Sequence, residues 1–338
     1  MSQAGNEVPK GRFGRSRKSI AVSDRGLVRV TPLTSGSRAV MCTPTVPRLD
    51  VREWLAGQDG VLARLRDEYG AVLLRGFVPL DADGLAELAT ALTGGLRDYD
   101  NRSTPRQRVS GNVFTSTEYP ADQVIPLHNE MSYTASWPST LFLTCLVPAA
   151  EGGETPLADS TRVFARVPAA VRERFERLGV MYVRNFGLGM DLTWQEVFQT
   201  QDRAEVNAYC RENGIQAEWL GEHRLRTRHV VQAAVEAKAS GEKVWFNQAH
   251  LFHVSSLPDG VQRELLESYS EDELPRTAFH GDGSPLHTDD LAAIRAAYEA
   301  EEIAVPWEPG DVMVVDNEQF AHGRRAYSGD RSVLVAMA

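Results

Sequence analysis

The stretch Leu127–Tyr133, with the sequence LHNEMSY, is the part of this chain most suited to chemistry. It places His128 and Glu130 two residues apart. Side chains two apart on a β-strand point to the same face, so this imidazole and this carboxylate could hold one metal ion. A second histidine would complete a set of two imidazoles and one carboxylate. Such a set leaves coordination positions open and is typical of non-haem Fe(II) oxygenases.

The third ligand is predicted to be His322, which follows a turn signal and the short apolar run Val312–Asp316. The H-x-E pair alone is a weak signal, because a histidine beside a solvated glutamate often occurs by chance. Arg331 strengthens it, since a guanidinium in the same cavity could grip the carboxylate of a keto acid with two hydrogen bonds. Taken alone, Arg331 fits a surface ion pair with Asp330 or Glu318 equally well.

The elements that must position these residues are short. Apolar runs predict strands, and apolar residues at threes and fours predict helices between them. Many short strands interrupted by helices predict one closed or sandwiched β-core that carries helices at its sides. The predicted strands are 71–77, 140–147, 180–186, 243–247, 312–316 and 332–337; the predicted helices are 50–69, 81–92, 162–178, 193–213, 260–268 and 289–302, with loop over 93–112 and a tight turn over 151–154.

Composition excludes several classes of protein. The chain has 338 residues and a formal net charge of −10, which argues against general affinity for nucleic acid or anionic lipid. Its three cysteines (Cys42, Cys145 and Cys210) are far apart, which indicates reduced thiols in a cytoplasmic protein. No apolar run is long enough to span a bilayer, and the basic N-terminus lacks the apolar stretch of a secretory signal. We expect a disordered arm over residues 1–20 and a single domain over 21–338.

Four segments together resemble the taurine dioxygenase (TauD/TfdA) family of Fe(II)/2-oxoglutarate-dependent oxygenases. They occur in the family's order and span most of residues 50–338. The wording around LHNEMSY is most similar to the syringomycin-type branch of amino acid hydroxylases, which serve nonribosomal peptide biosynthesis. The resemblance implies a mostly β fold, a double-stranded β-helix (jelly-roll) core with lateral helices and insertions. The segments are GAVLLRGF at 70–77, LHNEMSY at 127–133, EGGETPLADS at 151–160 and GDVMVVDNEQFAHGRRAYSGDRSVLVAM at 310–337.

This resemblance implies a role for five residues. The metal triad falls on His128, Glu130 and His322, and the contacts to 2-oxoglutarate fall on Thr155 and Arg331. Fe(II) would be the cofactor, with 2-oxoglutarate and O₂ as co-substrates. Most of the family has Asp where this chain has Glu130, although clavaminate synthase and its relatives share the Glu. Related halogenases have a small residue there, so a carboxylate favours hydroxylation over chlorination. Two further arginines, Arg324 and Arg325, leave the identity of the clamp open.

The function that the resemblance implies is hydroxylation of an unactivated C–H bond in natural-product biosynthesis. The substrate would be an amino acid or a derivative of one, either free or tethered to a carrier protein. The same chemistry could instead give desaturation, epoxidation or ring closure on another small molecule. A non-catalytic, cupin-like metal-binding module is an alternative from a different class, but it would not need Thr155 and Arg331. A zinc hydrolase is disfavoured because the sequence has neither HExxH nor GxSxG.

Several polar residues are candidates for substrate contacts. Asn247 and Gln248, in the run WFNQAHLFH, could bond a polar group of the substrate, or could simply end a strand beside core aromatics. Arg75 could bind a substrate carboxylate, although pairing with a buried acid explains it better. Asn129 is expected to be structural, and two further histidines, His280 and His287, are expected to lie in loops. The polar residues Asn112, Thr115, Ser116, Thr117 and Glu118 precede the metal stretch and could line the pocket, or merely form a loop.

Overall fold

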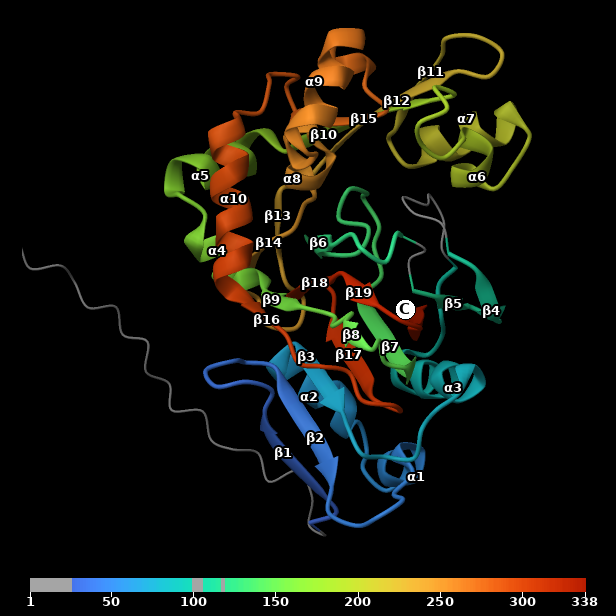
Figure 1. Ribbon diagram of the computed structural model, residues 1–338, viewed down its shortest axis with the longest axis vertical. Helices are drawn as coiled ribbons and strands as arrows, with labels where there is room; N and C mark the ends of the chain where they lie inside the picture. The colour runs from blue at the N-terminus through green and yellow to red at the C-terminus, as the bar shows by residue number, and fades with distance from the viewer. Residues whose placement is uncertain (1–25, 99–105, 117–118) are drawn as a thin grey trace, which may run out of the picture.

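The computed structural model describes residues 26–98, 106–116 and 119–338 (Figure 1). The arm predicted over residues 1–20 lies outside this part of the chain and stays a prediction. No helix among the described residues is long and apolar enough to cross a membrane.

The largest element is a sheet of eight strands in the order β1-β2-β3-β17-β7-β20-β5-β4. Its centre is built from apolar runs that the sequence predicts with the observed bounds, as in β7, β17 and β20. The segment 93–112, predicted as loop, contributes the short edge strand β4. The strands are β1 (Val28–Pro32), β2 (Val40–Pro44), β3 (Ala71–Leu74), β4 (Arg108–Ser110), β5 (Val113–Thr115), β7 (Thr140–Val147), β17 (Val312–Asp316) and β20 (Ser332–Met337).

A second sheet, in the order β16-β9-β18-β6, faces the first and completes the predicted jelly roll (Figure 1). A two-stranded ribbon, β8 with β19, lies beside it, so the turn predicted over 151–154 begins as a strand. Gly152 in this ribbon has φ +69°, and a Cβ there would lie 2.2 Å from the carbonyl oxygen of Ala326, so only glycine fits. The strands are β6 (Ile125–His128), β8 (Glu151–Gly152), β9 (Leu157–Asp159), β16 (Glu302–Ile303), β18 (Phe320–Arg324) and β19 (Tyr327–Ser328).

The core is divided by the large sheet. On β17, Met313 and Val315 belong to the apolar cluster between the two sheets, whereas Val312 and Val314 belong to the cluster under the N-terminal helices. Burial on both faces explains why these strands read as continuous apolar runs. The helix predicted over 50–69 is divided in two. The N-terminal helices are α1 (Val51–Ala56), α2 (Val61–Tyr69) and α3 (Ala82–Thr93), the last capped by the Asp81 side chain.

Two further helices lie against β9, and a third packs through Phe175 on Trp245 and His280 (Figure 1). The helix predicted over 162–178 is divided into α4 and α5, because Pro168 cannot continue a helix and disfavours helical backbone at Val167. Asp159 caps α4 by accepting hydrogen bonds from the Thr161 and Arg162 amides. The helices are α4 (Ser160–Arg166), α5 (Ala169–Leu178) and α10 (Thr288–Glu301).

Residues 180–280 form an insertion that lies above the jelly roll in Figure 1. It has its own four-stranded sheet, β11-β12-β10-β15, and an apolar cluster that includes Trp194 and Leu225. The helix predicted over 193–213 is two helices, and His280 ends a strand instead of lying in a loop. The elements are β10 (Val180–Phe186), α6 (Trp194–Phe198), α7 (Arg203–Glu212), β11 (Gln216–Trp219), β12 (Leu225–Val231), β13 (Ala234–Glu236), β14 (Lys243–Trp245), α8 (Ala249–Phe252), α9 (Asp259–Ser268), β15 (Arg276–His280) and the 3₁₀ turns Val254–Ser256 and Glu271–Glu273.

Candidate metal centre

The two residues of the H-x-E pair do not share a strand, so the prediction of a common strand face is wrong. Strand β6 ends at His128, and Glu130 lies in the turn that follows. Asn317 holds this turn: its side-chain carbonyl accepts from the Glu130 amide at 2.7 Å, and its side-chain NH₂ donates to the Glu130 carbonyl at 2.9 Å. Met131, the next residue, has φ +56°, a conformation that few non-glycine residues adopt. The tertiary contact with Asn317, not strand pleating, aims the carboxylate.

His322 nevertheless meets the pair as predicted. It lies on β18 directly opposite His128 on β6, and the two ring centroids are 4.6 Å apart. The Nε2 atom of His322 is 3.8 Å from Oε2 of Glu130, and one ligand atom from each of the three residues lies within 4.8 Å of the others. Ligands about 2.1 Å from a shared ion lie roughly 3–4 Å apart, so small side-chain shifts would bring all three onto one ion.

The protonation states suit a metal. Burial lowers the pKa of His128, and burial together with the nearby His128 ring lowers that of His322 to about 3, so both rings are neutral at pH 7. Burial alone would raise the pKa of Glu130, but the charge of Arg106 is the largest of the effects that lower it to about 2. Neutral imidazole and ionised carboxylate are the forms that bind a cation. The His128 Nδ1–H donates to the Pro126 carbonyl at 2.8 Å, which leaves Nε2 to face the ion.

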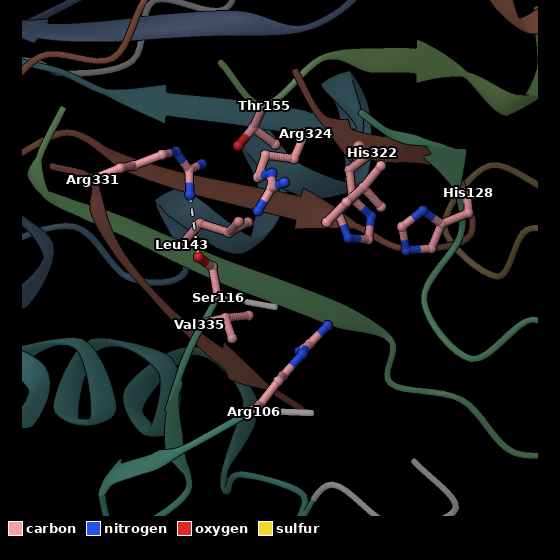
Figure 2. A pocket seen from close by; sticks show the side chains of 11 residues that line it. Arg106, Ser116, His128, Leu143, Thr155, His322, Arg324, Arg331 and Val335 are labelled. Carbon is pink, nitrogen blue, oxygen red and sulfur yellow. Dashed lines mark hydrogen bonds between the residues drawn. The ribbon is translucent and has the colours of Figure 1, made fainter. Parts of the chain in front are cut away.

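A small cavity opens beside the two imidazoles (Figure 2). Apolar side chains from the large sheet, Leu143 and Val335, form part of its wall. Three arginines enter it, which makes it electropositive. Its lining residues are Arg106, Ser116, Ile125, His128, Leu143, Thr155, His322, Gly323, Arg324, Arg331 and Val335.

Arg331 is the arginine best placed to accept an anion. Its Nε donates to the Gly153 carbonyl at 2.9 Å and its Nη1 to the Ser116 hydroxyl at 3.2 Å, which orients the guanidinium toward the cavity (Figure 2). Burial, and then the charge of Arg324, lower the pKa of Arg331 to about 10. Both effects disfavour the charged guanidinium, so an anion bound beside it would stabilise it. Thr155 lines the same cavity, and its hydroxyl accepts from the Trp307 indole at 3.2 Å.

The two alternative arginines are engaged elsewhere. Arg324 also lines the cavity, but its guanidinium donates to the backbone carbonyls of Tyr119, Pro120 and Gln123. Arg325 is exposed and pairs with Glu302 outside the cavity. The geometry therefore favours Arg331 over both neighbours as the clamp.

The residues predicted to contact substrate are placed differently. Asn247 is fully buried and bonded to the Ala233 carbonyl and the Ala249 amide, while the Gln248 side chain donates to the Asn129 carbonyl. Arg75 forms an ion pair with Asp311 at 2.6 Å. None of these side chains lines the cavity, which favours structural roles.

Of the predicted loop residues that precede β6, some line the cavity and others do not. Asn112 lies in the turn between β4 and β5, bonded to Arg108 and the Leu96 carbonyl, and Thr117 lies outside the described residues. Ser116 does line the cavity. Asn129, expected to be structural, is fully buried and bonds Ser160 and the Asn317 carbonyl.

Two contributors were missed in the sequence. Asn317 appears there only as one polar residue after a strand, and Arg106 belongs to a polar segment without a motif. Both act through contacts with residues far along the chain: Asn317 lies 187 positions from Glu130 and Arg106 lies 24 positions from it. No local pattern could have found either.

Comparison with known proteins agrees with this geometry. The sequence model of the "Taurine catabolism dioxygenase TauD, TfdA family" matches residues 29–337. This chain belongs to the TauD/TfdA family. It is 36% identical over 309 residues to the dapdiamide synthesis protein DdaC of Enterobacter agglomerans, covering 91% of this chain and 93% of the relative. It is 33% identical over 296 residues to a clavaminate synthase-like protein of Arabidopsis thaliana, covering 83% and 84%.

Solved structures show the same fold at low sequence identity. PvcB of Pseudomonas aeruginosa superposes with a TM-score of 0.55 and 16% identity, covering 95% of this chain and 94% of that one. As a TauD/TfdA member, the protein is an Fe(II)/2-oxoglutarate-dependent dioxygenase with a jelly-roll core. Membership in an enzyme family also favours catalysis over the alternative of a non-catalytic metal-binding module.

Proposed function

We propose that this dioxygenase hydroxylates an unactivated C–H bond of an amino acid or an amino-acid-derived small molecule in natural-product biosynthesis, with the substrate free or tethered to a carrier protein. One observation carries the assignment of the centre: His128, Glu130 and His322 offer ligand atoms within 4.8 Å of one another beside an electropositive cavity. The name of the dapdiamide synthesis relative and the resemblance to syringomycin-type hydroxylases support the biosynthetic setting.

Each residue has a distinct task in this proposal. His128, Glu130 and His322 hold Fe(II), which with 2-oxoglutarate and O₂ supplies the oxidising chemistry. Arg331 binds the distal carboxylate of 2-oxoglutarate, and Thr155 offers a hydroxyl on the same wall. The apolar side chains of Leu143 and Val335 limit water near the reacting carbon. Desaturation, epoxidation or ring closure would use the same residues and differ in where the substrate carbon lies.

The proposal is tested by an anaerobic titration with Fe(II) and 2-oxoglutarate, which gives a visible charge-transfer band when both bind. His128→Ala should abolish this band because it removes a ligand. His287→Ala is the matched control, since His287 is exposed at the start of α10 and should leave the band unchanged. A wild-type protein without the band, or a His128→Ala variant that keeps it, would contradict the proposal.

The substrate class is tested by a screen of free and carrier-bound amino acids for succinate release. A product heavier by one oxygen atom indicates hydroxylation, or epoxidation where the substrate has a double bond, and a product lighter by two hydrogens indicates desaturation or ring closure. If no amino acid, free or tethered, stimulates succinate release, the substrate part of the proposal is wrong, whereas the charge-transfer band still reports on the metal centre.

A further inference from the structure

Three arginines line the cavity: Arg331 is assigned to 2-oxoglutarate, Arg324 is bonded to backbone carbonyls, and Arg106 has neither of these roles. It lies just before β4, and its side chain is 5% exposed. Its Nη2 donates to Oε2 of Glu130 at 2.6 Å, and its Nη1 lies 3.7 Å from the sulfur of Met337. Oε2 is also the carboxylate oxygen 3.8 Å from His322 Nε2. The guanidinium therefore contacts the face of Glu130 that a metal ion would use.

The position of Arg106 relative to the cavity is unusual for a residue that only supports a ligand. The guanidinium lines the cavity together with both imidazoles, whereas Glu130 lies behind it and does not. Figure 2 shows Arg106 and Arg331 entering from different sides, with the side chain of Arg106 directed toward the histidines. A molecule in the cavity would thus meet two separate guanidinium groups, one of them next to the metal ligands.

A bound metal changes the surroundings of Arg106. Once Glu130 shares its charge with a dication, the carboxylate attracts the guanidinium less and the ion repels it. The five N–H groups of a guanidinium are fixed in a planar fork that suits a carboxylate. Arg106 would then turn some of these N–H groups toward the cavity. An anion there could supply the negative charge and the hydrogen-bond acceptors that Glu130 shares with the metal.

The charges of the described residues point the same way. Arg106, Arg324 and Arg331 line the cavity, no carboxylate of the described residues lines it, and Glu130 and Glu154 lie near it, which leaves an excess of positive charge. Fe(II) and the dianion of 2-oxoglutarate cancel each other, so the excess remains after both bind. A low-dielectric cavity with one sign of charge attracts ligands of the opposite sign.

We infer that Arg106 is a specificity-determining residue that binds a free carboxylate of the substrate. The inference rests on the proposed function and narrows the substrate to an anion, which Arg106 holds beside the metal while Arg331 holds 2-oxoglutarate from another side of the cavity. A substrate tethered through its own α-carboxyl group would satisfy Arg106 only with a carboxylate on its side chain.

The test compares acids with matching amides. Enzyme loaded anaerobically with Fe(II) and 2-oxoglutarate is titrated with the proteinogenic L-amino acids and their N-acetyl derivatives, each as free acid and primary carboxamide. Aspartyl and glutamyl pantetheine thioesters are compared with the asparaginyl and glutaminyl ones. The readout is the shift of the charge-transfer band, which needs no turnover. The variants are Arg106→Gln, Arg106→Lys and, as matched control, Arg325→Gln, which alters an exposed arginine outside the cavity.

We expect the best acid to bind wild type, Arg106→Lys and Arg325→Gln at least about tenfold more tightly than its amide, and we expect this preference to vanish in Arg106→Gln. Equal binding of acids and amides to wild type, no response to any compound, or a preference that survives in Arg106→Gln would overturn the inference. Loss of the band itself in Arg106→Gln would also overturn it, because Arg106 would then serve Glu130 alone. A wild-type enzyme that forms no band would instead refute the proposed function.

Discussion

Two stretches of this chain combine histidines with buried amide side chains, and they are used differently. At the end of β6, His128 and Glu130 meet His322, and Asn317 holds the turn between them. At the end of β14, Asn247 and Gln248 precede His250 and His253. His250 bonds the Leu127 carbonyl and stacks on Tyr298, while His253 pairs with Ser255 and Glu271.

The difference lies in what the histidines face. Both stretches contain buried rings whose pKa is lowered by burial, so low basicity alone does not mark a ligand. In the first stretch two rings and a carboxylate converge beside a cavity. In the second, His250 and His253 contact separate groups and do not converge, and among the described residues His128, Glu130 and His322 are the group that could hold an ion. A candidate metal site therefore differs from the core in that its side chains converge on one point beside a cavity. Burial and residue composition do not distinguish the two.

The comparison is tested most strongly by two equally buried asparagines. Asn317→Ala removes three hydrogen bonds that hold the Glu130 turn and join it to Pro138. We expect a loss of about 2–4 kcal/mol in the free energy of unfolding and a fall in Mn(II) affinity of roughly 10–100-fold, because the carboxylate loses its aim. Calorimetric titration with Mn(II) measures the second effect.

Asn247→Ala is the matched control, since it also removes bonds to buried backbone groups. It should lower the free energy of unfolding by about 2–3 kcal/mol and leave Mn(II) affinity unchanged. If both variants lose metal affinity equally, the stretch after β14 supports the metal centre as much as the Glu130 turn does.

A smaller effect concerns the pH dependence of stability at His250. Burial lowers its folded-state pKa to about 3, while the unfolded value is about 6.5. Below pH 6.5 the unfolded chain takes up a proton that the folded chain does not, so stability falls on acidification by about 1.4 kcal/mol between pH 7.5 and 5.5. Urea unfolding of His250→Gln should show a loss smaller by this amount. The same pH dependence in variant and wild type would mean that His250 titrates normally when folded.

The smallest effect is expected where the two stretches touch. The Gln248 side chain donates to the Asn129 carbonyl at 2.8 Å, and this carbonyl also accepts from the Ser132 hydroxyl. Because the carbonyl keeps a partner, Gln248→Ala should cost only about 1 kcal/mol in the free energy of unfolding. Mn(II) affinity should stay within a few-fold of wild type. A loss as large as that of Asn317→Ala would show that the second stretch supports the metal centre after all.

The sequence determined the parts of this protein that depend on local pattern. The apolar runs at β7, β10, β17 and β20 form buried strands. Because each run begins and ends where the apolar residues do, its bounds could be predicted from the sequence. The resemblance carried by LHNEMSY and by the segment around His322 led to the family and to the three converging side chains. The sequence also predicted where helices occur, but not where they are interrupted. The helix predicted over 162–178, for example, is divided at Pro168.

Only the tertiary structure decided how these parts become a site. Glu130 is aimed by Asn317 across 187 positions, and Arg106 reaches the same carboxylate from a segment without a motif. The same packing turned Asn247 and Gln248 away from the cavity and into the backbone of the core. Sequence spacing specifies which side chains share a strand or helix face, but contacts between distant segments depend on how the sheets and insertion pack. That packing, which no local pattern encodes, directs Arg331 into the cavity and bonds Arg324 to backbone carbonyls and Arg325 to Glu302.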